Sequence, residues 1–148
     1  MNTDNKQAIN ELLNRAAYGL DVRDLSILSQ CFAENAQMSL RIAGGDLIGP
    51  FEGRDAIMKL MTDSMDVQTD QRRHQVSNVF FEGAGEGAGE GAGEGAADRA
   101  TVVSNLSLMS IENGAIALIS TGVYRDEVVL NEGQWQLLNR YLELDLPY

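Results

Sequence analysis

Residues 99–145 read RATVVSNLSLMSIENGAIALISTGVYRDEVVLNEGQWQLLNRYLELD, and this stretch decides the fold class. Two turn signals divide it, Asn113-Gly114 and Asn131-Glu132-Gly133. Asn-Gly between apolar runs is a strong hairpin signal, because both residues tolerate the positive φ that a tight turn needs. The stretch therefore predicts three long antiparallel strands, over residues 99–111, 115–130 and 134–145.

The segments before this stretch add strands and helices. Alternating apolar residues predict a strand over residues 36–42, an edge strand over 47–51 that contains Pro50, and a long strand over 73–82. Apolar residues spaced by three and four predict helices over residues 6–20 and 53–65. Asp24 is placed to cap a further short helix that carries Leu25, Leu28 and Phe32 on one side. Three helices set apart from a mostly antiparallel sheet indicate an α+β domain.

One segment has an unusual composition. Residues 83–95 contain 7 of the 15 glycines, as three copies of Gly-Ala-Gly-Glu followed by Gly95. So much glycine offers no side chains to pack and makes ordering entropically costly. We expect a mobile loop between two strands, either a tolerated repeat expansion or a lid over a pocket. The whole chain, residues 1–148, is then one domain.

Composition and charge exclude several functions. The formal net charge is −11, which argues against nucleic acid or an anionic membrane as partner, since both require basic patches. No run approaches 18 apolar residues and the N-terminus does not have the pattern of a signal peptide, so we expect a soluble, cytoplasmic protein. With one cysteine, Cys31, and one histidine, His74, a structural zinc site is close to impossible, and we expect no metal and no cofactor. We expect Cys31 to be a small core residue.

His74 is the side chain on which acid–base chemistry would depend, because its ordinary pKa alone lies near neutrality. Strand alternation predicts that it shares a face with Val76, Asn78 and Phe80. Asp21, between the first two helices, is the candidate partner, since a carboxylate beside an imidazole fixes its tautomer and raises its basicity. Both residues also have ordinary structural roles, a satisfied strand histidine and a helix cap.

Tyr18 lies one helical turn before Asp21 and could donate a hydrogen bond to a substrate oxygen, although half-buried packing explains it equally well. Trp135, Tyr141 and Phe81 fit core or interface positions.

Several of these stretches together resemble the SnoaL-like branch of the nuclear transport factor two-like superfamily. The resemblance extends over nearly the whole chain and is carried by residues 18–24, 32–36, 51–57, 73–79, 121–126 and 135–145. It implies a cone-shaped α+β barrel, in which a strongly bent, mostly antiparallel sheet wraps around a pocket with three helices. It also implies a homodimer or homotrimer.

Members similar to scytalone dehydratase and to hexachlorocyclohexane dehydrochlorinase carry a catalytic aspartate after the first helix and a histidine on the first long strand. Asp21 and His74 match those positions. The chain lacks the second histidine of the former and the lysine of the latter. An arginine on a late strand has its counterpart in Arg125, with Arg140 as the competing position.

The resemblance and the residues together predict a cofactor-independent lyase or isomerase, of dehydratase or cyclase type, that acts on a small apolar oxygenated molecule. His74 would be the general base and Asp21 its orienter, and Tyr18, Asn78 and Arg125 would bind the substrate. The alternative is a non-catalytic module, because residues 73–79, 104–105, 122–126 and 140–145 also resemble the small (beta) subunit of aromatic-ring-hydroxylating dioxygenases.

Overall fold

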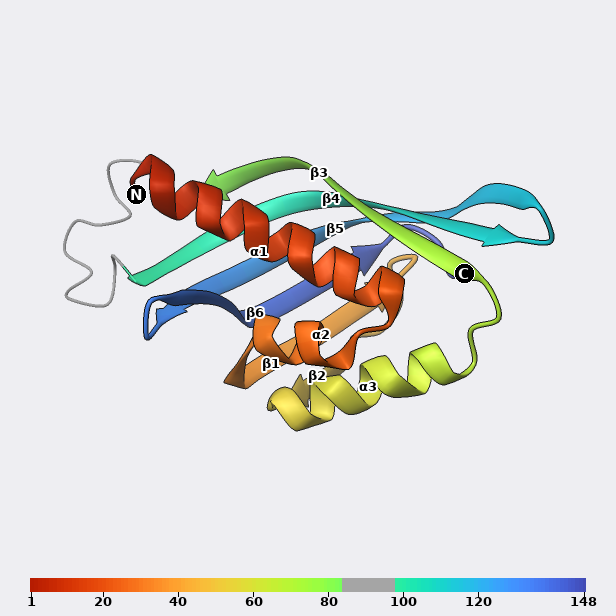
Figure 1. The fold of residues 1–148 in the computed structure, drawn as a ribbon, viewed down its shortest axis with the longest axis horizontal. Helices are drawn as coiled ribbons and strands as arrows, with labels where there is room; N and C mark the ends of the chain where they lie inside the picture. The colour runs from red at the N-terminus through yellow and green to blue at the C-terminus, as the bar shows by residue number, and fades with distance from the viewer. Residues whose placement is uncertain (84–97) are drawn as a thin grey trace.

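The computed structural model describes residues 1–83 and 98–148 (Figure 1). Along the chain the elements are α1 (Thr3–Val22), α2 (Leu25–Cys31), β1 (Phe32–Ile42), β2 (Ile48–Glu52), α3 (Arg54–Asp66), β3 (Gln71–Glu82), β4 (Arg99–Glu112), β5 (Ala115–Asn131) and β6 (Gln134–Leu144). Every predicted helix and strand is present, with ends shifted by a few residues. The loop predicted over residues 83–95 lies, apart from Gly83, outside the described residues.

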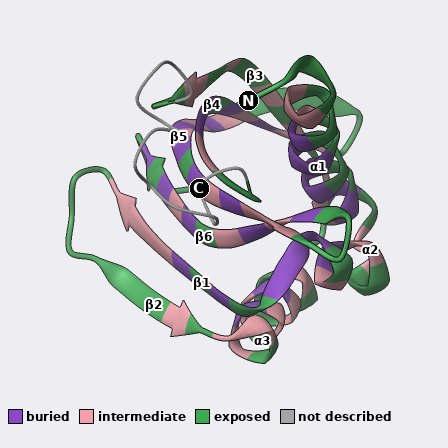
Figure 2. Ribbon diagram, turned by 90° about the vertical axis from the view of Figure 1, so that its left-hand side faces the viewer, coloured by how far each residue is buried: buried purple, intermediate pink, exposed green. Residues whose placement is uncertain are grey.

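The strands of residues 1–83 and 98–148 form one six-stranded sheet in the order β2-β1-β6-β5-β4-β3. All neighbouring pairs are antiparallel except β1 and β6, which run parallel. Seen end-on, the sheet forms an arc whose open side is closed by the helices (Figure 2). The expected α+β architecture of a bent sheet and three helices is confirmed, and the sheet is open between its edge strands β2 and β3.

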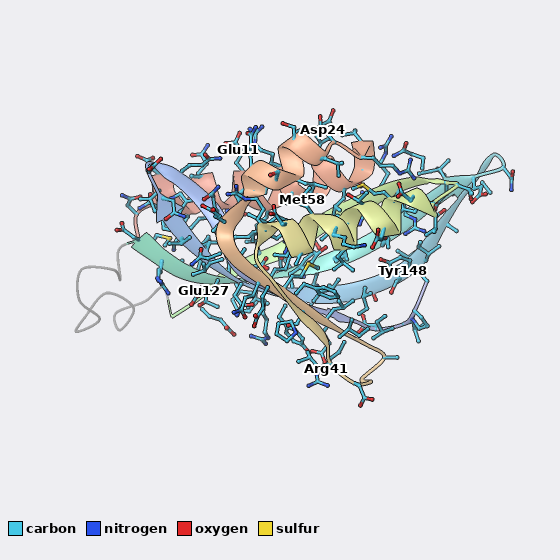
Figure 3. All side chains as sticks on the ribbon, turned by 90° about the horizontal axis from the view of Figure 1, so that it is seen from below. Glu11, Asp24, Arg41, Met58, Glu127 and Tyr148 are labelled. Atoms are coloured by element: carbon cyan, nitrogen blue, oxygen red, sulfur yellow. The ribbon has the colours of Figure 1, made fainter. Side chains whose placement is uncertain are left out.

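The main core lies between the helices and the concave face of the sheet. α1 and α3 lie on the same side of the sheet (Figure 3). Ile9, Leu13 and Ala16 of α1 are almost fully buried and pack in one cluster with Phe32 and Leu137. A second, smaller cluster of the same face contains residues of the central and C-terminal strands, namely Leu106, Tyr124, Leu142 and Leu144.

The junction between α1 and α2 follows from local capping. α1 ends where Arg23 takes the left-handed conformation, with φ of 55°. Asp24 then caps α2, because its side chain accepts a hydrogen bond from the Ile27 amide at 3.0 Å. Phe32, predicted on the helix, instead begins β1 and is buried in the core. That prediction is wrong because helical spacing alone does not show where a seven-residue helix stops.

A β-bulge in β3 changes which residues face the core. Ser77 pairs with Asn105 and Phe80 pairs with Val103, so one extra residue is inserted between them. Asn78, with φ of 54°, lies in the bulge and is exposed. Beyond it Phe80 is 52% exposed, while Phe81 packs against the core. The prediction that Phe80 shares a face with His74 is therefore wrong, because strict alternation does not continue through the bulge.

Candidate active site

Asp21 and His74 meet where the last turn of α1 approaches the start of β3. They are 53 residues apart in the sequence, and the helix runs alongside this strand in the opposite direction (Figure 1). Both side chains are largely buried, with 11% of Asp21 and 12% of His74 exposed. The structure thus brings together the two residues that the sequence suggested as a pair.

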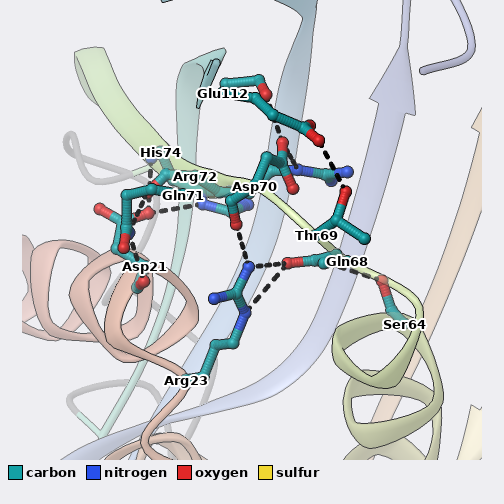
Figure 4. A network of polar contacts seen from close by, with 11 residues as sticks. Asp21, Arg23, Ser64, Gln68, Thr69, Asp70, Gln71, Arg72, His74 and Glu112 are labelled. Atoms are coloured by element: carbon teal, nitrogen blue, oxygen red, sulfur yellow. Dashed lines mark hydrogen bonds and ion pairs between the residues drawn. The ribbon is translucent and has the colours of Figure 1, made fainter. Parts of the chain in front are cut away.

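One carboxylate oxygen holds the histidine at two points. Asp21 Oδ1 accepts a hydrogen bond from the His74 backbone amide at 2.7 Å and another from ring atom Nδ1 at 2.8 Å (Figure 4). Because a carboxylate can only accept, the proton of this second bond belongs to Nδ1. The neutral ring then carries its free lone pair on Nε2. Within residues 1–83 and 98–148, Nε2 has no hydrogen-bond partner.

Neighbouring polar side chains fix the backbone around this pair. The Gln71 side-chain amide donates to the main-chain oxygens of Asp21 and Arg72, both at 2.8 Å. Arg23 donates to Gln68 Oε1 at 3.1 Å and also to the main-chain oxygen of Asp70. These bonds tie the end of α1 to the segment that leads from α3 into β3 (Figure 4). The helix end and the strand start are therefore held together by more than the Asp21 carboxylate.

Asp70 is the second buried carboxylate of this network. It accepts hydrogen bonds from the Ser110 hydroxyl and, at 2.9 Å, from Arg72 Nε. The Ser110 bond is the main cause that lowers the pKa of the Asp70 carboxyl, with Arg72 adding to it against the opposing effect of burial. The Arg72 guanidinium also lies 4.9 Å from the centre of the Tyr148 ring. Arg72 is thus already engaged by a carboxylate and an aromatic ring.

The three predicted substrate-binding residues are all exposed. Tyr18 is 57% exposed and Asn78 is exposed in the bulge of β3. Arg125 is about half exposed and forms an ion pair with Glu82 at 2.6 Å. Since Tyr124 and Asp126 on either side of it are buried, Arg125 points to the opposite, convex face of the sheet.

Arg140, the competing arginine, lies in the interior instead. Its side chain donates to both oxygens of Asp126, from Nε at 3.0 Å and from Nη2 at 3.1 Å. The guanidinium also lies 3.8 Å from the centre of the Tyr124 ring. Burial raises the pKa of the Asp126 carboxyl, against the opposing effect of Arg140, and raises the pKa of Tyr124 to about 12. The Tyr124 phenol is therefore a hydrogen-bond donor at neutral pH.

Sequence reasoning did not select Tyr124, Asp126 or Ser104, yet all three face the interior. Ser104 pairs with Tyr124 in the β4–β5 register and is 1% exposed. The signal that could have found them was the period-two pattern of β5, where Tyr124, Asp126 and Val128 alternate with outward-facing residues, and that of β4, where Ser104, Leu106 and Leu108 do the same. The same pattern places Arg125 outside.

Cys31 is buried, as expected of a core residue, and burial raises the pKa of its thiol. It contributes to a cleft of about 300 Å³ between α1, α2 and the β5–β6 turn, which does not include Asp21 or His74. In the part of the chain that the structure describes, no three His, Cys, Asp or Glu side chains are placed to hold a metal ion. None of the described helices has the length and apolar character needed to cross a bilayer.

Several solved structures share this fold over nearly their full length. A Nostoc punctiforme PCC 73102 protein of unknown function with a cystatin-like fold is 21% identical, with a TM-score of 0.76, 99% of this chain and 97% of that chain covered. A Novosphingobium aromaticivorans protein provisionally described as a scytalone dehydratase is 23% identical, with a TM-score of 0.70 and coverages of 95% and 83%.

A third structure from Novosphingobium aromaticivorans is provisionally described as the beta subunit of an aromatic-ring-hydroxylating dioxygenase. It is 14% identical, with a TM-score of 0.75 and coverages of 96% and 90%. At these identities the likeness shows the fold alone. Comparison with curated proteins finds no significant match. The sequence profile of the SnoaL-like domain, however, matches residues 2–141, and the chain therefore belongs to the SnoaL-like family.

Proposed function

We propose that this protein is a cofactor-independent lyase or isomerase in which His74 removes a proton from a small, largely apolar, oxygenated substrate. The observation that carries the proposal is the doubly hydrogen-bonded Asp21 carboxylate, which holds the His74 ring by Nδ1 and leaves Nε2 as the base. A base oriented in this way is ready for proton transfer without rotating the ring.

The reaction needs no external reagent. His74 Nε2 accepts a proton from a carbon next to an electron-withdrawing group, and the C–H electron pair moves to form a double bond. In an elimination, the bond to a leaving oxygen breaks and that oxygen takes the proton back from the imidazolium, so that water departs. In an isomerisation, the imidazolium returns the proton to a different carbon of the same molecule.

Asp21 supports both halves of this cycle. Its negative charge lies 2.8 Å from Nδ1 and stabilises the imidazolium that forms when Nε2 takes the proton. Asp21→Asn would replace that charge with a neutral amide, which can also favour the wrong tautomer. We therefore expect Asp21 to act by setting the tautomer of His74 and stabilising its protonated form, and not by contact with the substrate.

The test is turnover of a panel of hydroxylated aromatic and alicyclic ketones, followed by the absorbance of the new conjugated double bond. A companion measurement in D₂O records deuterium incorporation at the carbon that loses its proton. His74→Gln and Asp21→Asn should each lower kcat/KM by roughly 10²–10⁴-fold. Gln75→Ala, at the exposed neighbouring position of β3, is the matched control and should retain turnover.

The alternative function, a non-catalytic small subunit, predicts a different set of results. The wild-type protein would turn over no member of the panel and incorporate no deuterium, and it would co-purify with a large oxygenase subunit. Turnover that survives in His74→Gln would refute the catalytic assignment directly.

A further inference from the structure

Ser104 is a buried polar residue without a partner. It is 1% exposed, and its Oγ forms no hydrogen bond within the described parts of the chain. A buried hydroxyl left unpaired destabilises the folded state, because it has given up its bonds to water. Such a group requires an explanation, and a bound ligand with a donor or acceptor can supply the missing bond.

Ser104 lies in a small polar group on the concave face. Across the strand pair it faces Tyr124, whose ring is covered by the Arg140 guanidinium at 3.8 Å. The Tyr124 hydroxyl also makes no hydrogen bond to a described residue, and Arg140 uses only two of its five N–H groups on Asp126. Three neighbouring strands thus bring unused donors and acceptors to one place.

This polar group and His74 occupy the same face of the sheet. His74 pairs with Leu108, and Ser104 lies four residues further along β4, about 13 Å away at roughly 3.3 Å per residue. Between them is Leu106, buried in an apolar cluster with Leu142. A molecule reaching from His74 to Ser104 would therefore have an apolar body with the reacting carbon at one end and a polar group at the other.

The charges indicate which polar group fits. Arg140, the cation of this group, is neutralised by two hydrogen bonds to Asp126. Asp21, at the other end, adds a negative charge. A carboxylate bound here would lose its hydration without gaining an unpaired cation. A carbonyl or hydroxyl would meet hydrogen-bond donors without the desolvation penalty of a charge.

We propose that Ser104, Tyr124 and the Arg140–Asp126 pair form a subsite for a neutral oxygen function, a carbonyl or hydroxyl, of an elongated apolar substrate. The inference rests on the proposed function only in taking His74 as the reacting end. It selects neutral oxygenated molecules over the corresponding acids.

Equilibrium dialysis at pH 7 with three probes of equal ring size tests the subsite: 2-naphthol, 2-naphthoate and naphthalene. Wild-type protein should bind 2-naphthol at least several-fold tighter than either of the others. Ser104→Ala should weaken 2-naphthol binding roughly three- to tenfold, the effect of one hydrogen bond, and leave naphthalene binding unchanged. Tyr124→Phe should act in the same direction.

Ser107→Ala is the matched control, because Ser107 lies on the same strand with its side chain on the opposite face. It should leave the affinity for all three probes unchanged. Ser104→Ala should also keep or raise the urea midpoint of unfolding, since it removes an unpaired buried hydroxyl. Weakened 2-naphthol binding in Ser104→Ala would then not be a consequence of misfolding.

Three results would overturn the inference: 2-naphthoate binding as tightly as 2-naphthol, unchanged 2-naphthol affinity in Ser104→Ala, or no saturable 2-naphthol binding up to its solubility limit. The assay requires no turnover, and His74→Gln should keep the preference for the neutral probe. The binding assay thus tests the subsite independently of the turnover assay, which tests the catalytic proposal.

Discussion

Replacing Arg140 by methionine should destabilise the protein strongly. The substitution keeps an unbranched side chain in the core but removes both hydrogen bonds to Asp126 and the contact with the Tyr124 ring. Asp126 is 0% exposed, so water cannot replace the two lost hydrogen bonds. Removing one partner of a buried ion pair typically costs about 3–5 kcal/mol, and we expect Arg140→Met to fall in that range.

The pH dependence of this variant has a definite sign. Burial already raises the pKa of the Asp126 carboxyl, and loss of the cation that opposes this rise should raise it further. A carboxyl whose folded pKa lies above its unfolded value favours folding at low pH, and this contribution is lost as the pH rises through the folded pKa. The stability deficit of Arg140→Met should therefore be larger at pH 8 than at pH 5.

Urea unfolding at both pH values, followed by the fluorescence of the only tryptophan, Trp135, measures the effect. Lys59→Met is the surface control, because the Lys59–Asp63 pair is exposed and should leave the midpoint unchanged. Combining Arg140→Met with Asp126→Leu should recover much of the lost stability, since no unpaired charge then remains buried. A deficit below about 1 kcal/mol, or a double variant as unstable as the single one, would refute the reasoning.

Three further predictions concern stability. Asp70→Asn should lower the urea midpoint at pH 7 and make the midpoint decrease less as the pH is lowered. The reason is that a carboxyl with a lowered folded-state pKa stabilises the fold above its unfolded-state pKa, and this stabilisation is lost as the pH drops through the folded-state pKa. Gly122→Ala should cost about 1–3 kcal/mol in urea unfolding, since an added Cβ would lie 2.6 Å from the main-chain oxygen of Glu143. In thermal unfolding, Phe80→Ala should change stability by no more than about 0.5 kcal/mol and Phe81→Ala should cost about 2 kcal/mol, whereas the reverse order would contradict the bulge.

Most of the fold could be predicted from local patterns. Asn113-Gly114 sits at the β4–β5 turn because both residues take positive φ there, with values of 53° and 77°. Pro50 lies in β2, an edge strand of the sheet, where its missing N–H interrupts no ladder. Each of these features is decided within a few residues of chain. Sequence patterns report such short-range preferences well.

The errors arise where a local pattern is interrupted or where distant residues decide. The bulge at Asn78 exchanges which of the following residues face the core and which face outward, and the alternation of apolar residues in β3 does not predict it. Arg125 was predicted as the functional arginine, with Arg140 as the competing position, and the sequence does not show that Arg140 lies in the interior, where it pairs with Asp126 of the neighbouring strand. The Asp21–His74 pair was suggested by carboxylate–imidazole chemistry and then by family resemblance, because spacing alone does not bring residues 53 positions apart together.

The parallel pairing of β1 with β6 has a consequence for how the chain folds. β1 (Phe32–Ile42) has β2 as one neighbour in the sheet and β6 (Gln134–Leu144) as the other, about a hundred residues later in the chain. Contacts this distant in sequence form slowly, because a long loop must close before they stabilise anything. During synthesis, β1 must therefore wait for the roughly one hundred residues up to β6 to emerge before this strand pair can form. The contact of Asp21 with His74 needs only α1 and β3, so this pair can form before Arg140 of β6 arrives.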